Sequence, residues 1–309
     1  MQTILLPLNL TRDCRRPMRY GIELAAAMKA NLRLLHVAGS GGRARPYAWP
    51  AEWDETTRAS AAHKAVITGR PAERIAAYAN SIDADLILMP TRGRGLPGQL
   101  LFGSTTMDVL RIANQPLWIA KPQFVQTERP IRFKRVLCGV DLGAEGRSVL
   151  NCAARWAEAW DGEILVVHAV CGISEAMLMT YGSGDSGEVE LLPEMAHRKV
   201  ASMAAPIGVP WQVKIEVGDV AEVLLKFAKQ WRADVVIVGR GRRTGLWEFG
   251  TNIGDIIARS PCPVITVPHR AMRVRPAAHR IFRNTIAFPS PVERHDGSRR
   301  ELRRGCYST

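Results

Sequence analysis

The sequence predicts an α/β protein built from two doubly wound parallel five-stranded sheets, one in each half of the chain. Two observations lead to this fold class. Short apolar runs rich in Val, Ile and Leu alternate with segments of helical spacing, which is typical of parallel strands joined by crossover helices. The same order of segments then occurs a second time, so an internal repeat divides the 309 residues into two domains.

The repeat can be followed through equivalent positions of the two halves. Ile4 recurs as Val136, 132 residues later, and Gly103 recurs as Gly250, 147 residues later. Near the fourth strand the offset reaches 149, so the second half has gained 17 residues before its third strand and lost 2 in a later loop. We therefore expect two domains, at 1–123 and 134–270, followed by a separate segment at 271–309.

In the first half, five apolar runs predict strands near 3–8, 32–38, 64–68, 85–89 and 116–120. The runs are nearly continuous, which is expected of strands that helices cover on both faces. Between them, apolar residues spaced three and four apart predict helices near 13–30, 71–81 and 103–113.

The second half repeats this order. Its apolar runs predict strands near 136–140, 164–170, 212–217, 234–238 and 263–267, and its helical spacing predicts helices near 147–160, 220–228 and 249–259. The 17 extra residues lie within 171–205, where the Gly- and Ser-rich stretch 182–187 predicts a flexible loop.

Composition is that of an ordinary globular protein, with 47% hydrophobic and 23% charged residues. No apolar run approaches the roughly 18 residues needed to span a membrane, and the chain opens directly into a strand. None of the six cysteines forms a C-x-x-C pair, so buried free thiols in a reducing compartment are expected. We predict a cytoplasmic protein without a membrane span.

The last 39 residues are strongly basic. Nine arginines and three acidic residues follow Met272, so this segment supplies +6 of the formal net charge of +13. Such a segment can lie on nucleic acid or on an anionic membrane surface. No recognised nucleic-acid module accompanies the arginines. We therefore expect a basic, flexible, solvated tail at 271–309, with nucleic acid as the alternative partner.

A glycine-rich loop follows the fourth strand of the first half and runs into a helix. Its glycines let the backbone approach a phosphate closely, and the helix start offers unpaired N–H groups to an anion. Ser104 and Thr105 add hydroxyl groups, and Arg92 adds a positive charge. The alternative is a surface loop with an ordinary N-cap at Ser104.

These motifs together resemble the universal stress protein family. The first strand of a half ends in a carboxylate, the second in Leu-His-Val, and the fourth begins Ala-Asp-Leu-Ile before Gly-x2-Gly-x9-Gly-Ser/Thr. The resemblance spans about 1–123 and 134–270, which makes the chain similar to a tandem universal stress protein. It implies a Rossmann-like fold of the adenine nucleotide alpha hydrolase type. It also implies a site for ATP or a related nucleotide, present in some members, with phosphates at the late glycine pair and adenosine near the strand-one carboxylate.

The first half keeps the phosphate part of this motif, because nine residues separate Gly93 from Gly103. It departs from the motif at Pro90, which replaces the first glycine and lacks an N–H, and at Asn9, which replaces the aspartate without its charge. The resemblance implies nucleotide contacts from eight residues: Asn9, Val37, Met89, Arg92, Gly93, Gly103, Ser104 and Thr105.

The second half departs at other points. Arg242 occupies the second glycine position, only seven residues precede Gly250, and the loop is therefore two residues shorter. Positive charge from Arg240, Arg242 and Arg243 is one way to offset the changed geometry. The candidate contacts here are Asp141, Gly239, Gly250 and Thr251. We expect the first half to be the main nucleotide binder and the second half to be its packing partner.

The predicted function is regulatory binding of ATP or AMP, without a catalytic residue and with nucleotide-associated magnesium as the only metal. His36 and His168 end equivalent strands, and no partner at metal-ligand spacing accompanies them, so satisfied histidines are expected. One alternative is a nucleotide-free module that acts only through protein partners. Another is a slow ATPase or nucleotidyl transferase that uses Arg92 or Arg240 on phosphate charge. The two halves are expected to pair, within one chain or in a homodimer.

Overall fold

The computed structural model describes residues 3–11, 14–39, 49, 62–90, 103–125, 131–170, 187–241 and 252–268. The tail at 271–309 therefore lies outside the described residues. The strands of the first half are β1 (Thr3–Pro7), β2 (Asn31–Ala38), β3 (His63–Thr68), β4 (Leu86–Pro90) and β5 (Leu117–Ala120). Its helices are α1 (Arg15–Ala27), α3 (Pro71–Ser81), α4 (Ser104–Ile112) and the short α5 (Pro122–Val125).

The second half has the same order of elements. Its strands are β6 (Arg135–Gly139), β7 (Glu163–Val170), β8 (Trp211–Val217), β9 (Val235–Gly239) and β10 (Val264–Val267). Its helices are α6 (Ala144–Ala159), α8 (Gly187–Ala204), α9 (Val220–Gln230) and α10 (Asn252–Arg259). The sequence did not predict α8, although Ala196, Val200 and Ala204 recur every four residues and are buried.

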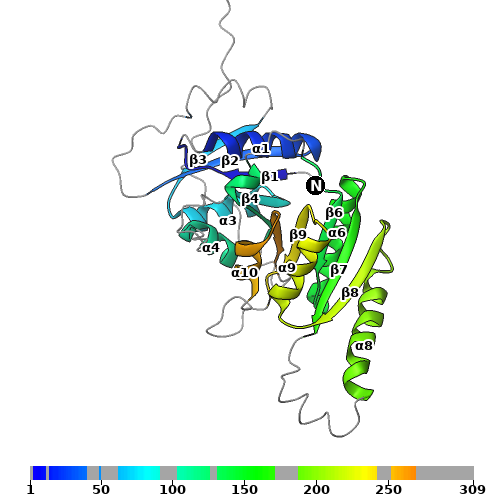
Figure 1. Cartoon of the computed structure of the whole chain (residues 1–309). Helices are drawn as coiled ribbons and strands as arrows, with labels where there is room; N and C mark the ends of the chain where they lie inside the picture. Colours follow the sequence, from blue (N-terminus) through cyan, green and yellow to red (C-terminus); the bar gives the residue numbers. More distant parts are fainter. Residues whose placement is uncertain are drawn as a thin grey trace, which may run out of the picture.

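The ten strands form one continuous sheet in the order β3-β2-β1-β4-β5-β10-β9-β6-β7-β8 (Figure 1). Each half contributes five parallel strands, which confirms the predicted fold class. The sequence did not predict that the two sets join edge to edge through β5 and β10. This junction, which we call the seam, is antiparallel. The strands of the two halves therefore run in opposite directions, and their carboxyl ends lie on opposite sides of the sheet.

The seam has two-fold pseudosymmetry. Trp118 pairs with Ile265, and these two residues are equivalent in the repeat, 147 positions apart. Leu117 pairs with Thr266, and Ile119 pairs with Val264, so each half offers the other the same strand in the same register. Such self-complementary pairing is the rule for symmetric dimers. The chain thus contains within itself the kind of interface that two copies form.

Helices cover both faces of the sheet and divide the core into two layers. Residues of α1, α6 and α8 pack on one face, and residues of α3, α4, α9 and α10 pack on the other. Both layers cross the seam without a break, because each contains buried residues of both halves. The seam is therefore part of the hydrophobic core.

Buried thiols are expected to make the stability depend on pH. Burial raises the pKa of Cys152 and of Cys262 from 9.0 to about 12. Between pH 9 and 12 the unfolded chain therefore binds fewer protons than the folded chain, and the free energy of unfolding falls as the pH rises. Urea unfolding at several pH values measures this slope. The double variant Cys152→Ala Cys262→Ala should flatten it, and an unchanged slope would show that these thiols are not its source.

Candidate functional site

The described part of the second half contains a cavity of about 560 Å³ at the carboxyl ends of its strands. Such a volume is in the usual range for a small-molecule site. The cavity lies where β6 pairs with β7 on one side and with β9 on the other. This reversal of strand order is the place where doubly wound sheets bind ligands.

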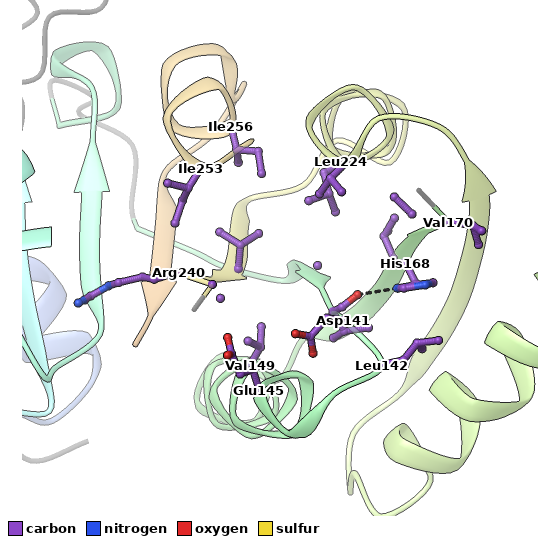
Figure 2. Close-up of a pocket in the computed structure, with 18 residues that line it drawn as sticks. Asp141, Leu142, Glu145, Val149, His168, Val170, Leu224, Arg240, Ile253 and Ile256 are labelled. Carbon is purple, nitrogen blue, oxygen red and sulfur yellow. Dashed lines mark hydrogen bonds between the residues drawn. The ribbon is translucent and has the colours of Figure 1, made fainter. Parts of the chain in front are cut away.

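The cavity wall is mostly aliphatic, with a few polar groups on one side. Asp141, Glu145 and Val149 lie across from Leu224, Ile253 and Ile256 (Figure 2). Further lining residues come from the ends of β6, β7 and β9 and from the start of α9: Gly139, Val140, Leu142, Val167, His168, Ala169, Val170, Val220, Val238, Gly239, Arg240 and Gly241. An apolar wall with a few convergent polar groups is typical of a small-molecule site.

The Asp141 carboxylate lies at the start of α6. Its Oδ1 accepts hydrogen bonds from the N–H groups of Gly143, at 3.2 Å, and Gly146, at 2.8 Å. These donors belong to the first turn of the helix, where N–H groups have no partner within the helix. The helix start therefore fixes the carboxylate at the edge of the cavity.

Gly146 allows this close approach because it has no side chain. A Cβ at this position would stand 2.3 Å from the main-chain oxygen of Asp141 and 2.8 Å from Met203 Cε. We expect Gly146→Ala to lower the free energy of unfolding by about 2 kcal/mol through overpacking. Gly254→Ala in α10 is the control, since a Cβ there meets nothing within 4 Å. Chemical denaturation of both variants tests this, and equal stabilities would contradict the expected clash.

Two histidines hold equivalent positions in the two halves. His168 Nδ1 lies 2.8 Å from the carbonyl oxygen of Val140, and His36 Nδ1 lies 2.8 Å from that of Leu8. Because a carbonyl oxygen only accepts, Nδ1 donates the hydrogen bond in both rings. Each bond ties the second strand of a half to the residue just before Asp141 or Asn9. Both histidines are thus held to the main chain through Nδ1, and His168 also lines the cavity.

Arg240 does not direct its charge into the cavity. Arg240 is 7% exposed, and its side chain extends away from the cavity toward the first half (Figure 2). The guanidinium donates to the carbonyl oxygens of Leu110, Ala113 and Gln115. Burial lowers the pKa of Arg240 to about 9, so it stays charged at neutral pH. The hypothesis that Arg240 offsets phosphate charge is therefore wrong, because its donors are used at the seam.

Asn9 in the first half makes different contacts from its equivalent, Asp141. Its Oδ1 accepts from the hydroxyl of Thr11 at 2.9 Å and from the thiol of Cys14 at 2.6 Å. Cys14 is the repeat equivalent of Gly146, so a side-chain donor replaces the main-chain N–H that binds Asp141. Val37 lies in β2 and Met89 in β4, the two strands that pair with β1. Asn9, Val37 and Met89 therefore lie in or just after the three strands of the first half that are equivalent to β6, β7 and β9 around the cavity.

The start of α4 does not have the ordinary N-cap at Ser104 that was the alternative to an anion site. Gly103 is the N-cap, and Ser104 is the first helical residue. No side chain caps this end, because glycine has no side chain. The N–H groups at the first helical positions, which begin at Ser104 and Thr105, have no partner within the helix and can bind an anion. A Cβ on Gly103 would meet nothing within 4 Å.

The structure brings together only part of each predicted site. Asp141 and Gly239 line one cavity, as expected of residues at the carboxyl ends of neighbouring strands. Six residues that the sequence analysis named for these sites lie outside the described part of the chain: Arg92, Gly93, Arg242, Arg243, Gly250 and Thr251. Sequence reasoning missed Glu145, although it follows Asp141 by one helical turn. Among the described residues, no group of three or more His, Cys, Asp or Glu side chains is placed to hold a metal ion.

A doubly wound sheet with a cavity at the reversal of strand order is the architecture in which α/β proteins hold small ligands. Two segments of the chain, residues 1–121 and 132–268, match the universal stress protein family. The chain belongs to this family of stress-response proteins, as a tandem member with two family segments.

Solved structures agree with this assignment at the level of fold. The chain is similar to a universal stress protein from Archaeoglobus fulgidus DSM 4304, with a TM-score of 0.61, 19% identity and coverage of 86% of this chain and 98% of that one. It is also similar to a protein of unknown function from Pseudomonas aeruginosa PAO1, with a TM-score of 0.66, 17% identity and coverage of 87% and 92%. Comparison with curated proteins finds no match. No helix in the described ranges is long and apolar enough to cross a membrane.

Proposed function

We propose that the chain binds ATP or a related adenine nucleotide as a regulatory ligand and does not turn it over. The cavity of about 560 Å³ beside Asp141 and Gly239 is the observation that carries this proposal. Its aliphatic walls suit a flat base. The Asp141 carboxylate can accept hydrogen bonds from the adenosine part.

The two halves support this function in different ways. The second half offers the described cavity and the carboxylate. The first half, which the sequence favours as the main binder, offers the uncapped start of α4 at Gly103, Ser104 and Thr105. We propose nucleotide binding at the carboxyl ends of the strands of either half, with the second-half cavity as the site that the described geometry supports best. The four described cysteines are free thiols, which supports the cytoplasm as the compartment.

The first test is to denature the purified full chain, identify any released nucleotide by mass spectrometry, and titrate stripped protein with ATP and AMP by calorimetry. Saturable binding with no steady release of phosphate is the expected result. No released nucleotide and no heat of binding would favour a module that acts only through protein partners. Phosphate release above background would favour the slow ATPase.

Two variants locate the site. Val170→Trp enlarges a side chain that lines the second-half cavity, and Val217→Trp is its control, since Val217 pairs with Val170 on the neighbouring strand and is 46% exposed. Gly103→Val tests the first half, since a Cβ at this position would meet nothing within 4 Å. We expect Val170→Trp to weaken ATP binding at least about tenfold, or about 1.4 kcal/mol, with no effect of the control. Loss of binding only in Gly103→Val would place the site in the first half.

A further inference from the structure

Arg240 belongs to two parts of the molecule at once. Its main chain follows β9 between Gly239 and Gly241, and all three residues line the second-half cavity. Gly241 has a φ of 74°, a left-handed conformation that glycine adopts without strain. The Arg240 side chain leaves the cavity and crosses the seam (Figure 2). One residue therefore connects the cavity wall to the first half.

Four hydrogen bonds hold the guanidinium in place. Nη1 donates to the carbonyl oxygens of Leu110, at 3.2 Å, and Ala113, at 2.7 Å, and Nη2 donates to that of Gln115. Nε donates to the Thr266 hydroxyl at 3.0 Å. The carbonyls lie at and just beyond the end of α4, where a helix leaves acceptors unpaired and attracts positive charge. Arg240 thus docks the end of a first-half helix onto the second half.

The other end of α4 begins at the predicted phosphate cradle of the first half. Gly103 is its N-cap, and Ser104 and Thr105 are its first residues. A single helix of 9 residues therefore connects Arg240 to that cradle.

A reciprocal contact exists across the seam. Lys121, which follows β5, donates from Nζ to the carbonyl oxygen of Ser260 at 2.8 Å. Ser260 is the repeat equivalent of Ala113 and follows α10, which contributes Ile253 and Ile256 to the cavity. Each half therefore holds the end of the helix that follows the other half's glycine-rich loop. The two contacts are unequal, since Arg240 makes three bonds to these carbonyls and Lys121 makes one.

We propose that Arg240 couples the two nucleotide sites, so that a ligand in the second-half cavity tightens the docking of α4 and changes ligand affinity at the first-half cradle. This inference rests on the proposed nucleotide binding. A ligand against the main chain at 239–241 restricts the residue whose side chain holds α4. By linkage, the effect on affinity has the same size in both directions.

Hydrogen exchange with mass spectrometry tests the coupling in the full-length Gly103→Val variant, which is designed to weaken ATP binding at the first-half cradle so that the cavity can be followed by itself. Saturating ATP should slow exchange in cavity peptides that cover 136–142 and 164–170, and also in α4. Adding Arg240→Met should abolish the effect on α4 and weaken ATP binding about fivefold. Arg240→Lys should restore part of both effects, since an ammonium keeps the charge but lacks the fork of donors. Arg259→Met, at an exposed ion pair with Glu222, is the control.

The outcomes separate the coupling from the proposed function. If ATP protects the cavity peptides but leaves exchange in α4 unchanged, the coupling is overturned and nucleotide binding stands. If ATP protects neither region, nucleotide binding in the second half fails, and the coupling fails with it. Protection of α4 that persists in Arg240→Met would also overturn the role of Arg240.

Discussion

Replacing Trp118 with alanine is expected to lower the free energy of unfolding by about 4 kcal/mol. Trp118 is fully buried in β5 of the first half, yet its ring lies 5.1 Å from that of Trp156 and 4.9 Å from that of Phe133. Both neighbours belong to the segment after residue 130. The substitution therefore opens a cavity in the core that the two halves share, and not in the core of one half.

Urea unfolding followed by circular dichroism measures this effect. We expect the variant to show an earlier transition, and also a broader one because the halves lose part of their common core. Trp211→Ala is the matched control, since Trp211 is only partly buried and lies on the edge strand β8. If Trp118→Ala lowers the free energy of unfolding no more than Trp211→Ala does, the seam contributes little to stability.

Replacing Arg240 with methionine is expected to cost about 3 kcal/mol of unfolding free energy. Methionine fills part of the space but donates no hydrogen bond, so the carbonyls of Leu110, Ala113 and Gln115 lose their charged donor. These groups are at a buried junction, where an unpaired acceptor is costly. Because Arg240 stabilises the contact between the halves, we expect the loss to appear as reduced cooperativity as well as reduced stability.

The matched control is Arg259→Met. Arg259 pairs with Glu222 on the surface, and its side chain is 51% exposed. Solvent screens such a pair, so its removal should leave the unfolding midpoint essentially unchanged. Equal midpoints for the two arginine variants would contradict the structural role assigned to Arg240.

Much of the fold could be predicted from the sequence because the repeat and the apolar runs are local signals. The seam could not be predicted in the same way, because pairing of β5 with β10 joins residues 145 to 149 positions apart. One signal was available. All residues of β5 and β10 are apolar apart from Thr266, whereas exposed edge strands usually contain charged residues. Two such strands in one chain indicate that neither is an exposed edge.

The candidate site was less predictable than the fold. Asp141 and Gly239 could be found because strand order brings their strand ends together. Arg240 was misread, because an arginine after a glycine at a strand end suits a phosphate as well as it suits a helix end. Its three carbonyl acceptors lie 125 to 130 residues away in the chain, and no local pattern shows them. Family resemblance supplied the motif, and only the three-dimensional contacts showed that Arg240 docks a helix end.

The most direct test of nucleotide binding at the strand ends is photolabelling of the full chain with 8-azido-ATP, followed by peptide mapping. We predict label on segments that line the second-half cavity, 139–142 and 167–170. Excess ATP should remove this label, and Val170→Trp should abolish it while Val217→Trp does not. If ATP-competable label is absent from the strand ends of both halves, the proposed nucleotide binding is contradicted. If the label is confined to the strand ends of the first half, the second-half cavity is not the site.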